Sequence, residues 1–148
     1  MNAIEFERRL RKLAVRDGMT FATLITLDDG DRAVLRTTML ARFDSSAVYA
    51  EREVNERLKA WLAGVGRMIE TDHVNLRRLL VDTQVLTRTS DCAEYRVHPE
   101  AAVALSAELA ALDAEAIAAG AKSEAETRRS ARKAAWLKQA GAAAPDSA

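Results

Sequence analysis

Apolar side chains recur every three or four residues in several stretches of the chain, which is the spacing of one face of an α-helix. This spacing predicts helices over about residues 3–16, 51–63 and 72–83. Helices of this length are marginal in water on their own, so their apolar faces should pack into a common core. The side chains that these helices are expected to bury are Phe6, Leu10, Leu13, Val54, Leu58, Trp61, Leu62, Leu76, Leu79 and Leu80.

The segments between these helices have weaker patterns. Residues 20–27 suit a strand by their threonines and branched aliphatic side chains, but their apolar positions also fit one helical face, and a short helix is slightly favoured. Residues 28–31 predict a turn, because Gly30 has a permissive backbone and the aspartates can cap a following helix over about residues 32–43. Residues 47–49 are apolar and predict a brief strand.

Two further strands are predicted at residues 85–89 and 94–98, joined by a polar connection of hairpin length. Two helices followed by a hairpin is the order of a winged helix. The predicted fold class is therefore mainly α with a small β-hairpin, a winged helix-turn-helix core with N- and C-terminal helical extensions. Its expected core side chains are Leu40, Phe43, Val54, Leu58, Trp61, Leu76, Leu79, Leu80 and Leu86.

The pattern divides the chain into three parts. Residues 1–30 form an N-terminal helical arm, residues 31–98 the winged-helix module, and residues 99–148 the C-terminal helices and a frayed tail. In the last part, an alanine-rich helix is expected from about residue 100 to 119, ended by Gly120. The capping-box spacing of Ser123 and Glu126 predicts that a second helix begins there.

Leucines on the alanine-rich helix form one stripe that needs a partner. We expect the stripe to pack either on the N-terminal helix or on the same surface of a second copy, with a homodimer favoured. Its members are Leu105, Leu109 and Leu112.

Composition narrows the function classes. The 22 basic and 22 acidic side chains balance, so no overall charge draws the protein to nucleic acid or to an anionic membrane. Cys92, His73 and His98 cannot build a four-ligand zinc site, and no phosphate-binding loop or nucleophile motif is present. We therefore expect neither a cofactor nor enzyme activity. Acidic residues within the apolar residues 101–121 argue against a membrane span, and a reducing cytoplasm is the expected location.

Two motifs carry a resemblance to a known family. Residues 51–58 (EREVNERL) and 76–82 (LRRLLVD), followed by Leu86, Arg88 and Tyr95, resemble the family called domain of unknown function 2087. The resemblance covers about residues 31–97, and it implies a helix-turn-helix-like module of bacterial proteins, sometimes joined to a regulator domain, with no established activity or catalytic residue.

The chain departs from that family pattern at one position. The family usually has a hydroxyl residue where this chain has Ala50, and that hydroxyl would cap the helix over about residues 51–63. Its loss costs about 1 kcal/mol unless Ser46 or a shifted helix start compensates.

The helix over residues 72–83 is the candidate recognition helix. Arginine and asparagine suit bidentate contacts with guanine and adenine edges, and valine can touch a thymine methyl group. The alternative is that Arg77 and Arg78 pair with Glu70, Asp72 or Asp82, which is about equally probable from the sequence. The side chains expected to face the bases are Val74, Asn75, Arg77, Arg78 and Val81.

Other basic side chains are candidates for phosphate contacts. Arg88 and Arg96 lie on the predicted hairpin, although ordinary exposed strand charges are the favoured explanation for both. A helical stripe near the C-terminus adds positive charge, for which a solvated face is the simpler explanation. Its members are Arg128, Arg129, Arg132 and Lys133.

The leading hypothesis is a transcriptional regulator that binds double-stranded DNA. The eight basic and eight acidic residues of residues 46–98 weaken it. The rival is a non-catalytic protein-interaction or assembly module with a winged-helix shape. RNA binding is disfavoured because the chain has few aromatic residues for stacking.

Overall fold

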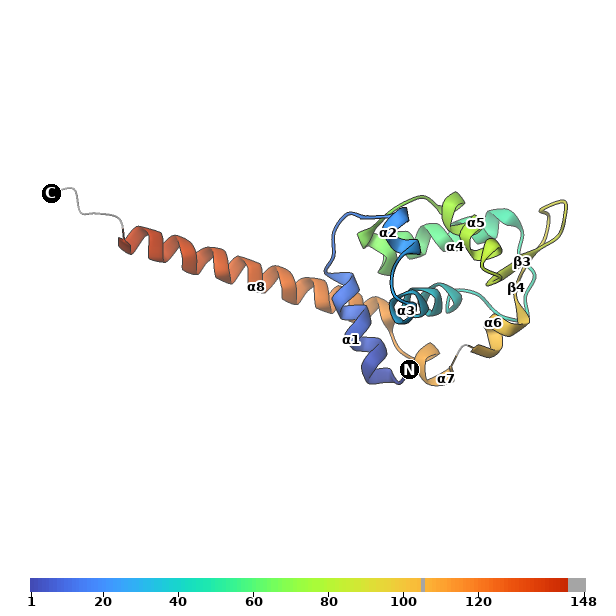
Figure 1. Ribbon diagram of the computed structural model, residues 1–148, viewed down its shortest axis with the longest axis horizontal. Coiled ribbons are helices and arrows are strands. Elements are labelled where there is room, and N and C mark those ends of the chain that lie inside the picture. The colour runs from blue at the N-terminus through green and yellow to red at the C-terminus, as the bar shows by residue number, and fades with distance from the viewer. Residues whose placement is uncertain (105, 144–148) are drawn as a thin grey trace.

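Helices make up most of residues 1–104 and 106–143, the part of the chain that the computed structural model describes (Figure 1). The strands are short and form two separate pairs, so the mainly α class with a small antiparallel hairpin is confirmed. In chain order the elements are α1 (Ala3–Ala14), β1 (Met19–Thr20), α2 (Phe21–Ile25), α3 (Asp29–Leu40), α4 (Glu51–Ala63), the 3-10 helix η1 (Val65–Met68), β2 (Ile69–Glu70), α5 (His73–Asp82), β3 (Leu86–Arg88), β4 (Tyr95–Val97), α6 (Pro99–Ala104), α7 (Ala107–Ala110) and α8 (Ala114–Ala143).

The three helices with clear apolar stripes form where they were predicted. Helix α5 begins after Asp72, whose carboxylate accepts a hydrogen bond from the backbone N–H of Asn75 at 2.8 Å. Helix α4 begins after Ala50, which has no side-chain oxygen to act as a cap. Instead, Glu53 Oε1 accepts a hydrogen bond from the Ala50 N–H at 3.1 Å. This half of a capping box offsets the missing hydroxyl, without Ser46 and without a shift of the helix start.

The segment before α3 divides between the two structures that its pattern allowed. Thr20 pairs with Glu70 in the parallel β1–β2 pair, and its hydroxyl then caps α2. The turn predicted for residues 28–31 is wrong for Asp29–Asp31, which form the first turn of α3. Asp28 is the cap of that helix, and its carboxylate accepts a hydrogen bond from the Asp31 N–H at 2.7 Å.

The central elements follow the order of a winged helix. Helix α3 is followed by Tyr49, which forms an antiparallel bridge with Tyr95 of β4. Helices α4 and α5 come next, and the β3–β4 hairpin pairs Leu86 with Val97. The predicted strand at residues 47–49 is thus reduced to one bridge. The order agrees with a winged helix, and that name remains an interpretation.

One core joins these elements. Trp61 of α4 is completely buried, and its Nε1 donates a hydrogen bond to Thr38 Oγ1 of α3 at 2.9 Å. The Thr38 hydroxyl in turn donates to the carbonyl oxygen of Leu35 at 2.7 Å, so each polar atom of this buried contact has a partner. The side chains of residues 31–98 that were predicted to form the core are buried, except that Leu62 and Leu79 are only partly so. Phe6, Leu10 and Leu13 of α1 belong to the same core.

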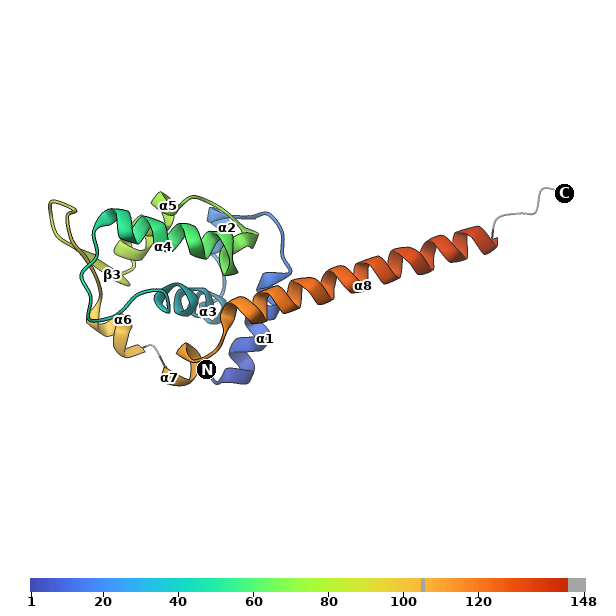
Figure 2. The same cartoon turned by 180° about the vertical axis from the view of Figure 1, so that it is seen from behind.

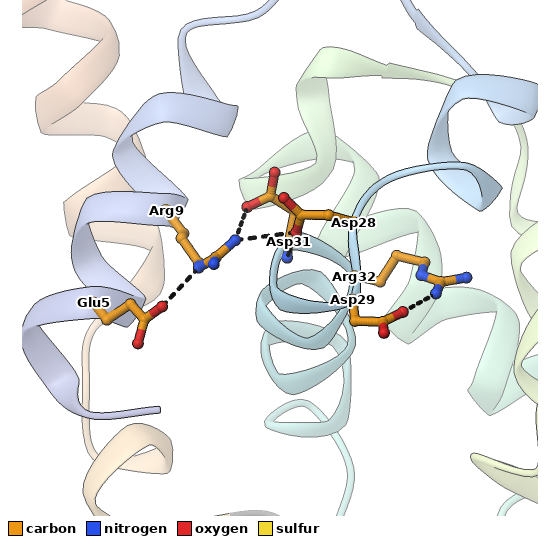
Figure 3. A network of polar contacts seen from close by, with 6 residues as sticks. All are labelled: Glu5, Arg9, Asp28, Asp29, Asp31 and Arg32. Carbon is orange, nitrogen blue, oxygen red and sulfur yellow. Dashed lines mark hydrogen bonds and ion pairs between the residues drawn. The ribbon is translucent and has the colours of Figure 1, made fainter.

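Helix α1 is also tied to α3 by an arginine (Figure 3). The Arg9 guanidinium donates to Glu5 Oε1 at 3.2 Å and to Asp28 Oδ1 and Asp31 Oδ1, each at 3.0 Å. The carboxylates of Asp31 and then Glu5 raise the pKa of Arg9. The first 30 residues are therefore fastened to the rest of the fold by both apolar and charged contacts.

The C-terminal helices differ from the prediction. The helix expected over about residues 100–119 is divided among α6, α7 and the start of α8, with Ser106 capping α7 and Asp113 Oδ1 accepting from the Ala116 N–H at 3.1 Å. The expected break at Gly120 and restart at Ser123 are wrong, because α8 runs through both. One glycine costs a helix about 1 kcal/mol relative to alanine, and the surrounding alanines offset this.

The leucine stripe packs within the chain. Leu109 and Leu112 are partly buried against the common core, and α7 contacts α1 and α3. Leu105 lies outside the described residues. Packing on the protein's own helices is thus the arrangement observed for the two described leucines, and a dimer through the same stripe remains a prediction.

Helix α8 extends far from the other helices (Figures 1 and 2). Its first turns are anchored by buried Ala118 and Ala121 and by ion pairs of Glu115 with Arg42 and of Glu124 with Arg11. Every residue from 126 to 142 is exposed. Within the described ranges, neither α8 nor another helix combines the length and the apolar character needed to cross a membrane.

Candidate nucleic-acid interface

Helix α5 turns one polar face towards solvent. Leu76 and Leu80 are buried, so the opposite face of the helix points outwards. Asn75 and Arg78 are exposed there, as the recognition-helix hypothesis requires. Val74 is half-buried.

Two of the predicted base-contacting side chains point elsewhere. Val81 packs against the core. The Arg77 guanidinium lies between α5 and α4, where Nη2 is 2.8 Å from Glu51 Oε1 and Nη1 donates a hydrogen bond to Asn55 Oδ1. Only 11% of its side chain is exposed, so Arg77 is a bridge between helices and is not free to meet a base edge. Its expected ion pairs with Glu70, Asp72 or Asp82 are wrong, since its carboxylate partner is on α4.

Arg78 has the opposite environment. It is exposed, and it forms none of the three ion pairs considered for it, nor any other, within the described ranges. Its charge therefore has no intramolecular partner to lose when it meets an anion. Of the two adjacent arginines, Arg78 is the one available for recognition.

The hairpin offers two exposed arginines with competing acidic groups. Arg88 and Arg96 are exposed, and Arg96 Nη2 lies 4.0 Å from Glu94 Oε2. At the hairpin turn, hydrogen bonds from the Thr89 hydroxyl and the Ala93 N–H lower the pKa of Asp91, which keeps that carboxylate charged. An anionic turn between two arginines makes the hairpin a weak phosphate site.

The strongest positive charge lies on α8. We define the basic segment as residues 127–142, which contain no acidic side chain. All of its residues are exposed, and because the whole chain is neutral, the remainder carries five excess negative charges. The basic members of the segment are Arg128, Arg129, Arg132, Lys133 and Lys138. The C-terminal stripe predicted from the sequence is thus one exposed surface, extended by Lys138.

A second feature of the basic segment is apolar. Trp136 is 65% exposed and Leu137 is 53% exposed. Arg128, Arg132 and Trp136 follow one another at intervals of four residues, so they lie along one side of the helix. The sequence placed the basic residues on a helix that begins near Ser123, and the structure adds that the Trp136 ring on the same stripe is exposed.

The candidate residues form two surfaces. Helix α5 and the β3–β4 hairpin belong to the helical body, whereas the basic segment is the far end of α8, away from that hairpin along the long axis of the molecule (Figures 1 and 2). His98 follows β4, and its Nδ1 accepts a hydrogen bond from the Glu100 N–H at 3.1 Å at the start of α6. Over residues 1–104 and 106–143, no three His, Cys, Asp or Glu side chains gather closely enough to hold a metal ion.

Comparison with known proteins identifies a family for the central elements. Residues 27–97 match the sequence model of a family described as an uncharacterized protein conserved in bacteria, DUF2087. The match runs from just before α3 to the end of β4, and it confirms the resemblance seen in the two helical motifs. No curated protein and no solved structure matches the chain.

Proposed function

Since residues 27–97 belong to the DUF2087 family, whose description assigns no activity, we propose from the geometry that the protein is a regulator that binds double-stranded DNA and catalyses no reaction. The observation that carries the proposal is the basic segment, which is exposed along its whole length and free of acidic side chains. In this proposal the basic segment holds phosphates, while Asn75 and Arg78 of α5 meet base edges.

The charges set the expected strength of the phosphate contacts. Each cation that neutralises a phosphate of B-DNA contributes about −0.9 to the slope of log affinity against log salt concentration. The five cations of the basic segment give a slope of at most about −4.5. Affinity should then fall by up to about 500-fold between 50 and 200 mM salt. The neutral module of residues 46–98 adds little to this slope.

Base recognition rests on α5. Its exposed Asn75 and Arg78 have the donors that suit adenine and guanine edges in the major groove. Because the basic segment lies at the other end of the molecule, one duplex reaches both surfaces only if it runs along the long axis or is shared by two copies. The second arrangement would involve the homodimer expected from the sequence.

The test combines fragment selection with salt titration. Purified protein is used to select fragments from bacterial genomic DNA at near-physiological salt, and binding to an enriched fragment is followed by fluorescence anisotropy. Arg78→Ala should weaken binding to the enriched sequence by about 1–3 kcal/mol and leave binding to an unrelated duplex unchanged. An absence of any enriched motif, together with no effect of Arg78→Ala, would contradict base recognition.

A matched pair of double variants tests the phosphate contacts. Arg128→Gln with Arg132→Gln should reduce the steepness of the salt slope by about 1.8 for every duplex. Lys59→Gln with Arg67→Gln removes the same charge from exposed sites on α4 and η1, and should leave the slope unchanged. Equal effects of the two pairs would show that only net charge matters and that the basic segment is not the phosphate site.

A second candidate is supported by the apolar groups on the same helix. The exposed Trp136 and Leu137 favour a protein-interaction module in which α8 binds an acidic partner helix or surface. Trp136→Ala separates the two functions, because phosphate contacts do not need the indole ring. Unchanged DNA binding by this variant supports the first function, and an absence of DNA binding by the unaltered protein leaves the second.

A further inference from the structure

A cleft of about 450 Å³ lies between α2, α3 and the C-terminal end of α5. Seven of its eleven lining side chains are apolar, and five of these seven belong to the buried core, so the apolar part of the wall is held in place by the fold. The apolar side chains that line the cleft are Leu24, Ile25, Leu35, Met39, Leu79, Leu80 and Val85. Its volume falls within the range of about 300–1,000 Å³ that is usual for small-molecule sites.

Two arginines of α3 lie at the rim of this apolar cleft. Arg32 and Arg36 are one helical turn apart, and both line the cleft. Asp29, the acidic side chain that lines it, pairs with Arg32 (Figure 3). Arg36 is exposed and has no ion-pair partner within residues 1–104 and 106–143. Because the charges of Asp29 and Arg32 cancel, the rim has a net charge of one positive unit, which belongs to Arg36.

We propose that this cleft binds a small organic anion with an apolar body, such as a monocarboxylate with an alkyl chain. The chain would cover the apolar wall and remove it from water. The carboxylate would accept hydrogen bonds from the Arg36 guanidinium, whose planar donors match its two oxygens. The proposal requires only the cleft and its rim, so it is independent of DNA binding.

Three related compounds test this ligand class. Octanoate has both the chain and the charge, octanol has the chain alone, and acetate has the charge alone. Each is titrated into the full-length protein labelled with nitrogen-15, and amide shifts are followed by NMR. Octanoate should give saturable shifts confined to α2, α3 and the end of α5, and should bind more tightly than the other two compounds. Octanol binding as tight as that of octanoate would overturn the anion preference, and shifts elsewhere would overturn the site.

Surface variants separate the two contributions without disturbing the core. Arg36→Gln should weaken the binding of octanoate about two- to fivefold, as expected for an exposed ion pair, and leave the binding of octanol unchanged. Ile25 lines the cleft and is 44% exposed, so Ile25→Ser should weaken the binding of octanoate and of octanol alike. Arg52→Gln removes an exposed arginine of α4 that is outside the cleft and serves as the charge control. If Arg52→Gln weakens octanoate as much as Arg36→Gln does, the proposed site is wrong.

Discussion

Arg77 and Arg78 are neighbours in sequence, but their positions on α5 give them different physical roles. Arg77 is enclosed by α4 and joined to Glu51 and Asn55, whereas Arg78 projects into solvent without an ion-pair partner in the described structure. Loss of Arg77 removes a bridge between two helices together with the packing of its aliphatic stem. Loss of Arg78 removes only a surface charge.

Alanine substitution of these two arginines should therefore separate stability from recognition. Arg77→Ala should lower the free energy of unfolding by about 1–3 kcal/mol, because it leaves the partly enclosed Glu51 and Asn55 without their donor. Arg78→Ala should change it by less than about 0.5 kcal/mol. Urea denaturation followed by circular dichroism measures both. Equal destabilisation would contradict the inward placement of Arg77.

Gly66 lies against the ring of Trp61. A Cβ atom at Gly66 would be 2.2 Å from Cζ3 of the Trp61 ring, so Gly66→Ala requires a buried ring to move. We expect the variant to unfold more readily by about 1–3 kcal/mol, the usual cost of overpacking. Gly120→Ala is the matched control, since nothing lies within 4 Å of its added methyl group. That control should stabilise α8 by about 0.5–1 kcal/mol, and thermal unfolding of both variants checks the difference.

The cap of α3 makes stability depend on pH. The backbone N–H of Asp31, followed by the charge of Arg9, lowers the pKa of Asp28 below its ordinary value of 3.8. A carboxyl group whose pKa is lower in the folded state stabilises the fold above the ordinary pKa, and that contribution is lost as pH falls through the folded value. Asp28→Asn keeps an oxygen that can cap the helix but cannot ionise. The free energy of unfolding should then fall less between pH 5 and about pH 3 in this variant than in the unaltered protein.

At the scale of elements, apolar periodicity was sufficient to predict a helix where large side chains mark one face. The stripes of α1, α4 and α5 predicted the positions of those helices and most of their buried residues. Where alanine dominates, no face of the helix stands out, and Gly120 and Ser123 were the only residues that suggested helix boundaries. They misplaced the helix boundaries because high alanine propensity outweighs one glycine. Before α3 the same use of glycine as a turn signal placed the helix start near residue 32, although the helix begins at Asp29 and Asp28 is its cap.

The candidate interface was predictable only in part. The exposure of Asn75 and Arg78 follows from their position opposite the buried leucines, and the basic residues of α8 are evident in the sequence. The partner of Arg77 is on a different helix, 26 residues earlier, so local spacing could not identify it. The cleft beside Arg36 is formed by three elements, and no local pattern indicates it.

The whole molecule separates its charges. The basic segment carries five positive charges, and the remaining residues carry five excess negative ones. Ending the chain after Glu126 should leave the urea midpoint nearly unchanged, because residues 127–142 are exposed and contribute no core side chain. The same truncation should remove most of the salt-dependent DNA affinity. A large loss of stability would show that the far half of α8 packs on another part of the protein or on a second copy.

The isolation of the far half of α8 has a consequence for its susceptibility to proteases. A helix without tertiary contacts opens locally at little free-energy cost, and a protease cleaves the opened backbone. The five arginines and lysines of this half are all trypsin sites, whereas α1 and α3 are secured by the core and by Arg9. Brief digestion should therefore shorten the chain from α8 first and leave the body intact. A bound partner that covers this half would slow its cleavage, so the length of the first fragment reports where on the molecule that partner sits.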